Sequence, residues 1–189
     1  ADEVFTGFGR TGRNFAVDYL KNKPDILALS KGITGGFMAL GVTSCTKRIV
    51  EAFDSQASDK TFHHGHSYTA NPLACAAANA SFELLIGDAC KKKINEISEM
   101  HARFANRMKG NKKILDARML GTILALEVRA GGKSNYENAL RAKIYSYFLE
   151  KNILLRPLGN VLYVLPPYVI AEEELTAIYE SIEEFLETI

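Results

Sequence analysis

The sequence of 189 residues lacks the features that mark several specialised classes of protein. It has only three cysteines, Cys45, Cys75 and Cys90, with no C-x-x-C spacing, which argues against a disulfide framework and favours reduced thiols in a cytoplasmic protein. The 23 basic and 22 acidic residues leave a net charge of +1, so no charge excess points to nucleic acid or to an anionic membrane as partner. No apolar run approaches the roughly 18 residues of a membrane span. The 47% hydrophobic content is ordinary for a globular chain.

The first part of the chain, residues 1–110, carries mixed strand and helix patterns. Residues 1–14 are rich in glycine and predict a loop after a strand end. A long segment from Ser55 to Asn71, rich in His, Ser and Gly, predicts a functional loop. The other elements expected here are strands over Ile26 to Leu29 and Phe37 to Ser44, a short helix over Thr46 to Phe53, a helix from Pro72 to about Leu85, and a helix from Asp88 to about Met108.

The composition shifts near residue 110, where we expect a domain boundary. The elements expected after it are strands over Ile114 to Arg118, Gly121 to Val128, Ile153 to Leu155 and Val161 to Leu165, with helices over Asn135 to Glu150 and Ala171 to Leu186. This order of strand pairs and helices is typical of a small α+β domain.

Lys31 is the residue that points most directly to a chemistry. It follows the apolar run that ends at Leu29 and precedes the pair Gly35-Gly36. A lysine at the end of a buried strand, desolvated and near other cations, has a lowered pKa and can form a Schiff base. The carboxylate of Asp2 can hold a pyridinium nitrogen in its protonated form. A surface lysine in a tight turn is the alternative interpretation of an isolated Ser-Lys-Gly, but the pair of Lys31 and Asp2 favours an enzyme that uses pyridoxal phosphate (PLP).

Four segments together resemble one enzyme family. They are residues 2–12 (DEVFTGFGRTG), 24–36 (PDILALSKGITGG), 64–74 (HGHSYTANPLA) and 156–167 (RPLGNVLYVLPP). The chain resembles the class III, or ω-type, aminotransferases, which are PLP enzymes of fold type I. The resemblance implies an α/β fold, in which residues 1–110 are the C-terminal portion of the PLP-binding large domain and residues 111–189 are a small α+β C-terminal domain. Since fold type I aminotransferases are roughly twice as long as this chain, we expect it to be the C-terminal half of such an enzyme.

The resemblance also implies residues that hold the cofactor. Lys31 would be the catalytic lysine and the covalent anchor of PLP, and Asp2 would bind the pyridine nitrogen. In the family, a Ser or Thr hydroxyl of the segment around residues 63–69 reaches across a homodimer interface to the cofactor phosphate of the partner chain. Ser67 is the residue assigned to this role, with Thr69 as the alternative. His63, His64 and His66 lie in the same segment, but no acidic or cysteine ligand accompanies them at helical spacing, so a metal site is not expected.

Three further residues are candidates for substrate binding. Arg10 follows the glycine-rich Gly7-Phe8-Gly9 and would lie near the active site, although a surface arginine is the alternative. Arg156 and Tyr163 occur in a segment that, in the branch of the family that serves biotin synthesis, binds the carboxylate of a keto acid. An arginine fork suits a carboxylate, but an ion pair within the small domain would account for Arg156 equally well on the sequence alone.

The expected function is therefore PLP-dependent transfer of an amino group to a keto acid, with S-adenosylmethionine or lysine as donor. Two alternatives stay open at this point. One is an aminotransferase for another ω-amino acid or a diamine. The other is a non-catalytic fragment, because the main phosphate-binding loop and the aromatic residue that stacks on the cofactor belong, in the family, to the other half of the enzyme.

Overall fold

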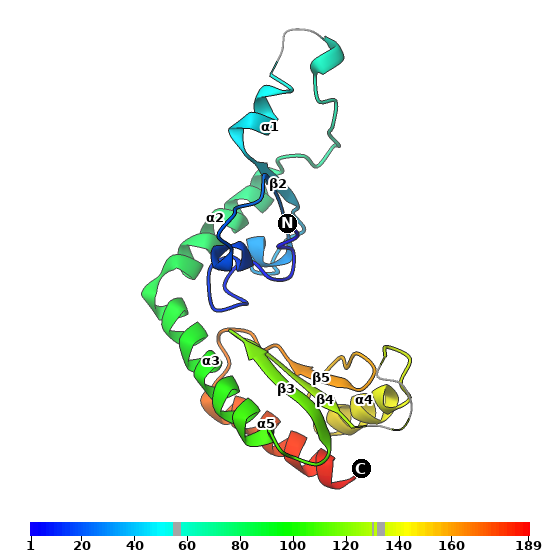
Figure 1. The fold of residues 1–189 in the computed structure, drawn as a ribbon. Coiled ribbons are helices and arrows are strands. Elements are labelled where there is room, and N and C mark those ends of the chain that lie inside the picture. Colours follow the sequence, from blue (N-terminus) through cyan, green and yellow to red (C-terminus); the bar gives the residue numbers. More distant parts are fainter. Residues whose placement is uncertain (55–57, 130, 132–134) are drawn as a thin grey trace. The chain divides into compact units, whose positions relative to one another are not determined.

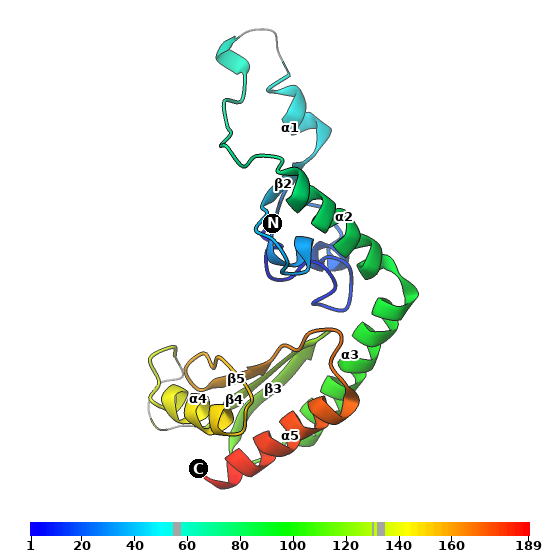
Figure 2. The same cartoon turned by 180° about the vertical axis from the view of Figure 1, so that it is seen from behind.

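The computed structural model describes residues 1–54, 58–129, 131 and 135–189 (Figures 1 and 2). The chain forms two compact units, residues 1–91 and 92–189. This division lies earlier than the domain boundary expected near residue 110. The reason is that α3 (Asp88–Met108) buries Ile97, Phe104 and Met108 in the hydrophobic core of the second unit, so nearly the whole helix belongs there.

The first unit is built around a small sheet. β1 (Ile26–Leu29) pairs antiparallel with β2 (Val42–Cys45), and Asp2 forms a parallel bridge with Ala28 of β1. The strand predicted over Phe37 to Ser44 begins only at Val42. Upstream of it, side chains bind the main chain instead: the Ser30 hydroxyl donates to the carbonyl of Leu40 (2.7 Å), and the Thr34 hydroxyl donates to the carbonyl of Met38 (2.5 Å). The short helices of this unit are η1 (Ala16–Tyr19), η2 (Lys31–Thr34), α1 (Lys47–Glu51) and η3 (Ser58–Lys60).

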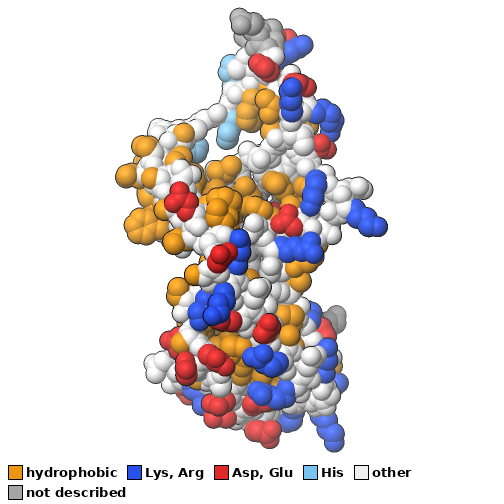
Figure 3. Space-filling view, turned by 90° about the vertical axis from the view of Figure 1, so that its left-hand side faces the viewer, with side chains coloured by type: hydrophobic (Ala, Val, Ile, Leu, Met, Phe, Trp, Pro, Cys, Tyr) orange, Lys and Arg blue, Asp and Glu red, His pale blue; other side chains and the backbone are white. Residues whose placement is uncertain are grey.

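The long helix of the first unit, α2 (Pro72–Ile86), begins where the sequence predicts. Pro72 occupies the first turn, where its missing N–H costs nothing, and the Asn71 side chain caps the helix by accepting the N–H of Leu73 (3.0 Å). Much of its apolar surface stays on the outside, and hydrophobic side chains gather on the side of this unit where α2 lies (Figure 3). The first unit therefore has a thin core, with Ala74 and Leu85 as the buried residues of α2.

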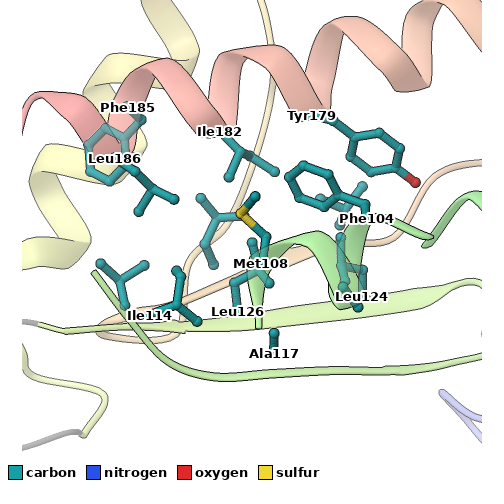
Figure 4. Close-up of a cluster of buried hydrophobic side chains, with 14 of the residues drawn as sticks. Phe104, Met108, Ile114, Ala117, Leu124, Leu126, Tyr179, Ile182, Phe185 and Leu186 are labelled. Carbon is teal, nitrogen blue, oxygen red and sulfur yellow. The ribbon is translucent and has the colours of Figure 1, made fainter. Parts of the chain in front are cut away.

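The second unit is an antiparallel sheet covered by helices, which confirms the predicted α+β pattern. The sheet order is β3 (Ile114–Leu120), β4 (Ile123–Val128), β5 (Val161–Val164). In β4 alternate side chains face the core, so that Leu124, Leu126 and Val128 are fully buried. Figure 4 shows α3 and α5 (Glu172–Glu187) directing Phe104, Met108, Tyr179, Ile182, Phe185 and Leu186 toward this face of the sheet.

Two predicted elements of the second unit differ from the structure. No strand forms over Ile153 to Leu155: the N–H of Ile153 bonds back to Phe148 at the end of α4 (Leu140–Glu150) (2.8 Å), and Leu155 packs in the core without joining the sheet. The helix expected from Asn135 begins only at Leu140. The reason is that the Asn138 side chain accepts the N–H of Leu140 (3.0 Å), a local bond that replaces helical ones.

No single helix in the described part of the chain is long and apolar enough to cross a membrane, and only the bent pair of α2 and α3 meets that test when counted together. Cys45, Cys75 and Cys90 are free thiols.

Candidate active site

The backbone brings Asp2 and Lys31 to the same edge of the first unit. The segment before Asp2 runs parallel to β1: the N–H of Ala28 bonds the carbonyl of Ala1 (2.9 Å), and the N–H of Glu3 bonds the carbonyl of Ala28 (2.9 Å). Lys31 follows β1 directly, and its Nζ lies 6.0 Å from the ring centre of Phe5. Asp2 therefore lies beside β1, and Lys31 follows the same strand.

The carboxylate of Asp2 keeps one oxygen available. Its Oδ1 accepts the N–H of Val4 (2.9 Å), which orients the side chain. Its Oδ2 makes no hydrogen bond or ion pair to the residues that the structure describes. An exposed carboxylate with a fixed orientation and one unoccupied oxygen can accept a hydrogen bond from a ligand.

Lys31 has an unusual backbone conformation. Its φ is +47°, in the left-handed region that residues other than glycine adopt at a cost of about 1 kcal/mol or more and that is common at functional sites. The expectation of a desolvated lysine after a buried strand is wrong for the described chain. Lys31 is exposed and β1 is only half-buried, because in these residues only β2 and the short segment near Asp2 flank the strand. Within the described residues the Lys31 amine forms no hydrogen bond or ion pair.

At Gly32, the loop that carries Arg10 packs against the main chain next to Lys31. A Cβ added at Gly32 would lie 2.9 Å from Cβ of Phe8, closer than side chains pack. Glycine therefore lets Phe8, which is buried, sit directly against the residue after Lys31. Arg10 is half-buried two residues further along the same loop. Sequence reasoning placed Arg10 near the site but missed this packing of Phe8 on Gly32, for which the sequence Ser-Lys-Gly alone gives no signal.

Glu3 holds this loop in place. It is only 1% exposed, and its carboxylate accepts the N–H of Val17 (2.6 Å) and the hydroxyl of Thr6 (2.5 Å). The prediction that Glu3 is structural, in contrast to its neighbour Asp2, agrees with these bonds. Alternation along the extended segment places Glu3 inside and Asp2 outside.

The segment around Ser67 is exposed. The Thr69 hydroxyl accepts the N–H of His66 (2.9 Å) in a local turn, and its own O–H can still donate. The Ser67 hydroxyl makes no hydrogen bond within the described part of the chain, which leaves it available to a ligand. The described residues contain no group of three or more His, Cys, Asp or Glu side chains that could hold a metal ion. Among the described residues, Ser67 makes no hydrogen bond to Lys31 or Asp2.

The remaining candidates lie in the second unit. Arg156 is exposed, but its neighbours Leu155 and Pro157 are both buried, so the main chain is anchored on either side of it. Tyr163 is in β5, half-exposed, opposite Ala125 of β4. The predicted site residues thus divide between the two units, with Asp2 and Lys31 in the first.

Comparisons with known proteins identify the family. Residues 1–186 match the family Aminotransferase class-III, and the chain belongs to it. Over 189 residues it is 42% identical to the adenosylmethionine-8-amino-7-oxononanoate aminotransferase of Synechococcus elongatus, covering 100% of this chain and 44% of that protein. The enzyme of the same name from Geobacter sulfurreducens is 37% identical over 195 residues and is covered to 43%.

Solved structures agree. The adenosylmethionine-8-amino-7-oxononanoate aminotransferase of Methanocaldococcus jannaschii superposes with a TM-score of 0.89 and 32% identity, covering 98% of this chain and 44% of that one. An aminotransferase of Bacillus anthracis gives a TM-score of 0.90 with 26% identity and 44% of its own length covered. These neighbours confirm the predicted fold class. The chain spans less than half the length of the relatives that it matches.

Proposed function

We propose that this chain is the C-terminal part of a PLP-dependent aminotransferase that converts 8-amino-7-oxononanoate (7-keto-8-aminopelargonate) to 7,8-diaminopelargonate in biotin synthesis. The amino donor would be S-adenosylmethionine or lysine. The observation that carries the proposal is the bridge of Asp2 to Ala28 of β1, the strand that Lys31 follows by two residues. Support for the particular substrate comes from the similarity, along the full length of the chain, to enzymes named adenosylmethionine-8-amino-7-oxononanoate aminotransferase.

The side chains fit PLP. Lys31 would hold the cofactor covalently, since its amine is exposed and has no other bond in the described residues. Asp2 would accept the pyridine N–H with its unoccupied Oδ2 and keep that nitrogen protonated. The bound cofactor supplies an electron sink that stabilises negative charge at the substrate carbon. Lys31, once released by the amino donor, would carry the proton from one carbon to the next.

The other candidates would position the phosphate and the substrate. Ser67 would donate its hydroxyl to the phosphate, and we propose that it does so in the partner subunit of a homodimer, because this hydroxyl is exposed and makes no hydrogen bond in the described chain. Arg10, Arg156 and Tyr163 would bind the substrate, with the guanidinium of Arg156 taking the carboxylate of the keto acid. These small-molecule partners suit a chain with no excess of charge.

The test uses the full-length enzyme and traps the cofactor chemically. Borohydride reduction followed by peptide mapping should leave the pyridoxyl group on Lys31, and Lys31→Ala should abolish transamination while leaving the fold intact. Lys21→Ala, a change at an exposed lysine, is the matched control and should keep activity. A label on another lysine would refute the assignment. Activity toward other ω-amino acids, with none toward 8-amino-7-oxononanoate, would favour the broader family alternative.

A further inference from the structure

The segment that carries Arg156 ends in a tight turn. Leu158 and Val161 exchange main-chain hydrogen bonds of 2.9 and 3.0 Å, which close the turn around Gly159 and Asn160. Gly159 has a φ of +61°, and a Cβ added there would overlap the carbonyl oxygen of Asn135. The turn is therefore held closely against the backbone before α4, and only glycine fits at its first corner.

Asn160 fastens this turn to the sheet. It is 2% exposed, and its side-chain Nδ2 donates to the carbonyl of Val128 (2.9 Å). Its own carbonyl accepts the N–H of Val128 (2.9 Å). A single residue thus occupies both main-chain groups of Val128, which is fully buried at the end of β4. One bond comes from the buried side-chain amide and the other from the main-chain carbonyl, and together they fix the turn firmly relative to the core, since breaking either would leave a buried polar group unpaired.

Arg156 lies four residues before Asn160 in the sequence. Its exposed side chain is long, so a small tilt of the main chain at residues 156–158 displaces the guanidinium by much more. Leu155 and Pro157 anchor the near side, and the Asn160 bonds anchor the far side. A bidentate arginine–carboxylate contact depends on the fork lying in one plane with the carboxylate. The fixed turn therefore supplies the orientation that such a contact needs.

We propose that Asn160 is a positioning residue for Arg156, which sets the affinity for the carboxylate of the keto acid substrate without contacting it. The inference rests on the proposed function, in which Arg156 binds that carboxylate. Asn160 acts through the turn 158–161 and leaves the chemistry at Lys31 unaffected.

The test compares acceptors with and without a carboxylate in the full-length enzyme. Asn160→Ala removes the side-chain donor, and Asn160→Asp keeps its shape but also removes it. Each should raise KM for the keto acid by about three- to tenfold, the effect of one lost buried hydrogen bond, with kcat nearly unchanged. KM for an aldehyde acceptor of similar length that lacks a carboxylate should stay the same. Asn95→Ala, at an exposed asparagine of α3, is the control and should change neither.

Two further measurements separate positioning from a general loss of stability. Hydrogen exchange of the Leu158 and Val161 amides should speed up in both variants, while the amides of Leu124 and Leu126 should keep their protection. In an Arg156→Ala background, Asn160→Ala should add no further increase in KM. An equal effect on both acceptors, or an additive effect in the double variant, would overturn the positioning role of Asn160 but not the proposed binding role of Arg156. If Arg156→Ala itself left KM for the keto acid unchanged, both the proposed binding role of Arg156 and this inference would fail.

Discussion

His101 of α3 is fully buried, yet both of its ring nitrogens have partners. Its Nε2 lies 3.1 Å from the carbonyl oxygen of Thr122, and its Nδ1 lies 2.7 Å from the hydroxyl of Tyr179. A carbonyl oxygen can only accept, so the proton of the neutral ring is on Nε2 and the Tyr179 hydroxyl donates to Nδ1. These bonds tie together α3, the turn between β3 and β4, and α5. Burial lowers the pKa of His101 to about 4 and raises the pKa of Tyr179.

The lowered pKa of His101 predicts that the second unit loses stability in weak acid. The unfolded chain takes up this proton below about pH 6.5, whereas the folded unit takes it up only near pH 4. Between these values the unfolded state binds more protons, so the free energy of unfolding falls as the pH drops from 6.5 to 4, by roughly 3 kcal/mol in all. Urea unfolding followed by far-ultraviolet circular dichroism at pH 7, 5.5 and 4.5 measures this.

Two variants test whether His101 causes this pH dependence of stability. His101→Gln cannot titrate, so the difference in stability between pH 7 and pH 4.5 should shrink, even though the variant is less stable overall. His64→Gln, at an exposed histidine, should keep the slope of the unaltered chain. A His101→Gln variant with an unchanged slope would show that other groups, such as the carboxylates, cause the acid sensitivity.

At the scale of elements, the long helices and the core strands could be predicted from the sequence, and several short segments could not. The spacing of Ile94, Ile97, Phe104 and Met108 defines the buried face of α3, because one continuous pattern decides it. The segment Ile153 to Leu155 is equally apolar, but apolarity signals burial and not strand pairing. Nothing in those three residues shows that the N–H of Ile153 bonds back to Phe148 in α4.

The same limit applies to the candidate site. Lys31, Asp2 and Arg10 could be proposed as candidates because they belong to local motifs. The exposure of Lys31 and the packing of Phe8 on Gly32 depend on which parts of the chain pack against β1. A local sequence pattern does not predict that packing. The hydrogen bonds of Asn160 to Val128 were missed for a similar reason. An asparagine after glycine indicates a turn, but the strand that it bonds to, β4, lies far from it in the sequence.

The segment around Ser67 leads to a prediction for the dimer. Because its hydroxyl is exposed and has no hydrogen bond in the described chain, we expect it to serve the active site of the partner subunit. Mixing full-length Lys31→Ala enzyme with full-length Ser67→Ala enzyme should form hybrid dimers with one intact site and recover part of the activity. Lys31→Ala mixed with Lys31→Ala/Ser67→Ala is the control and should recover none. Hybrids no more active than either parent would place the phosphate contact within one chain or on another residue, such as Thr69.

At the scale of the whole molecule, the two units differ in how much apolar surface they bury. The core of the second unit includes Phe104, Leu124, Phe148, Ile182 and Phe185, each 2% exposed or less. The first unit instead presents a hollow of about 620 Å³ between η2 and α2, lined by Phe37, Met38, Leu73 and Leu84 among others. Phe37 is 84% exposed and Leu84 74%. Apolar surface of this extent usually marks a place where other protein packs.

We therefore expect the 189-residue chain by itself to behave as one stable unit joined to one weak unit. Hydrogen exchange should show strong protection in β4, α3 and α5, and little in β1, β2 and α2, because protection follows the local free energy of opening. We expect the increase in protection to begin near residue 92, where the compact units divide, and not at 110. The exposed apolar face should make the chain self-associate, and without the rest of a family enzyme it should bind PLP weakly and be inactive. Equal protection in both units, together with tight PLP binding, would mean that the first unit is stable without any further partner for that face.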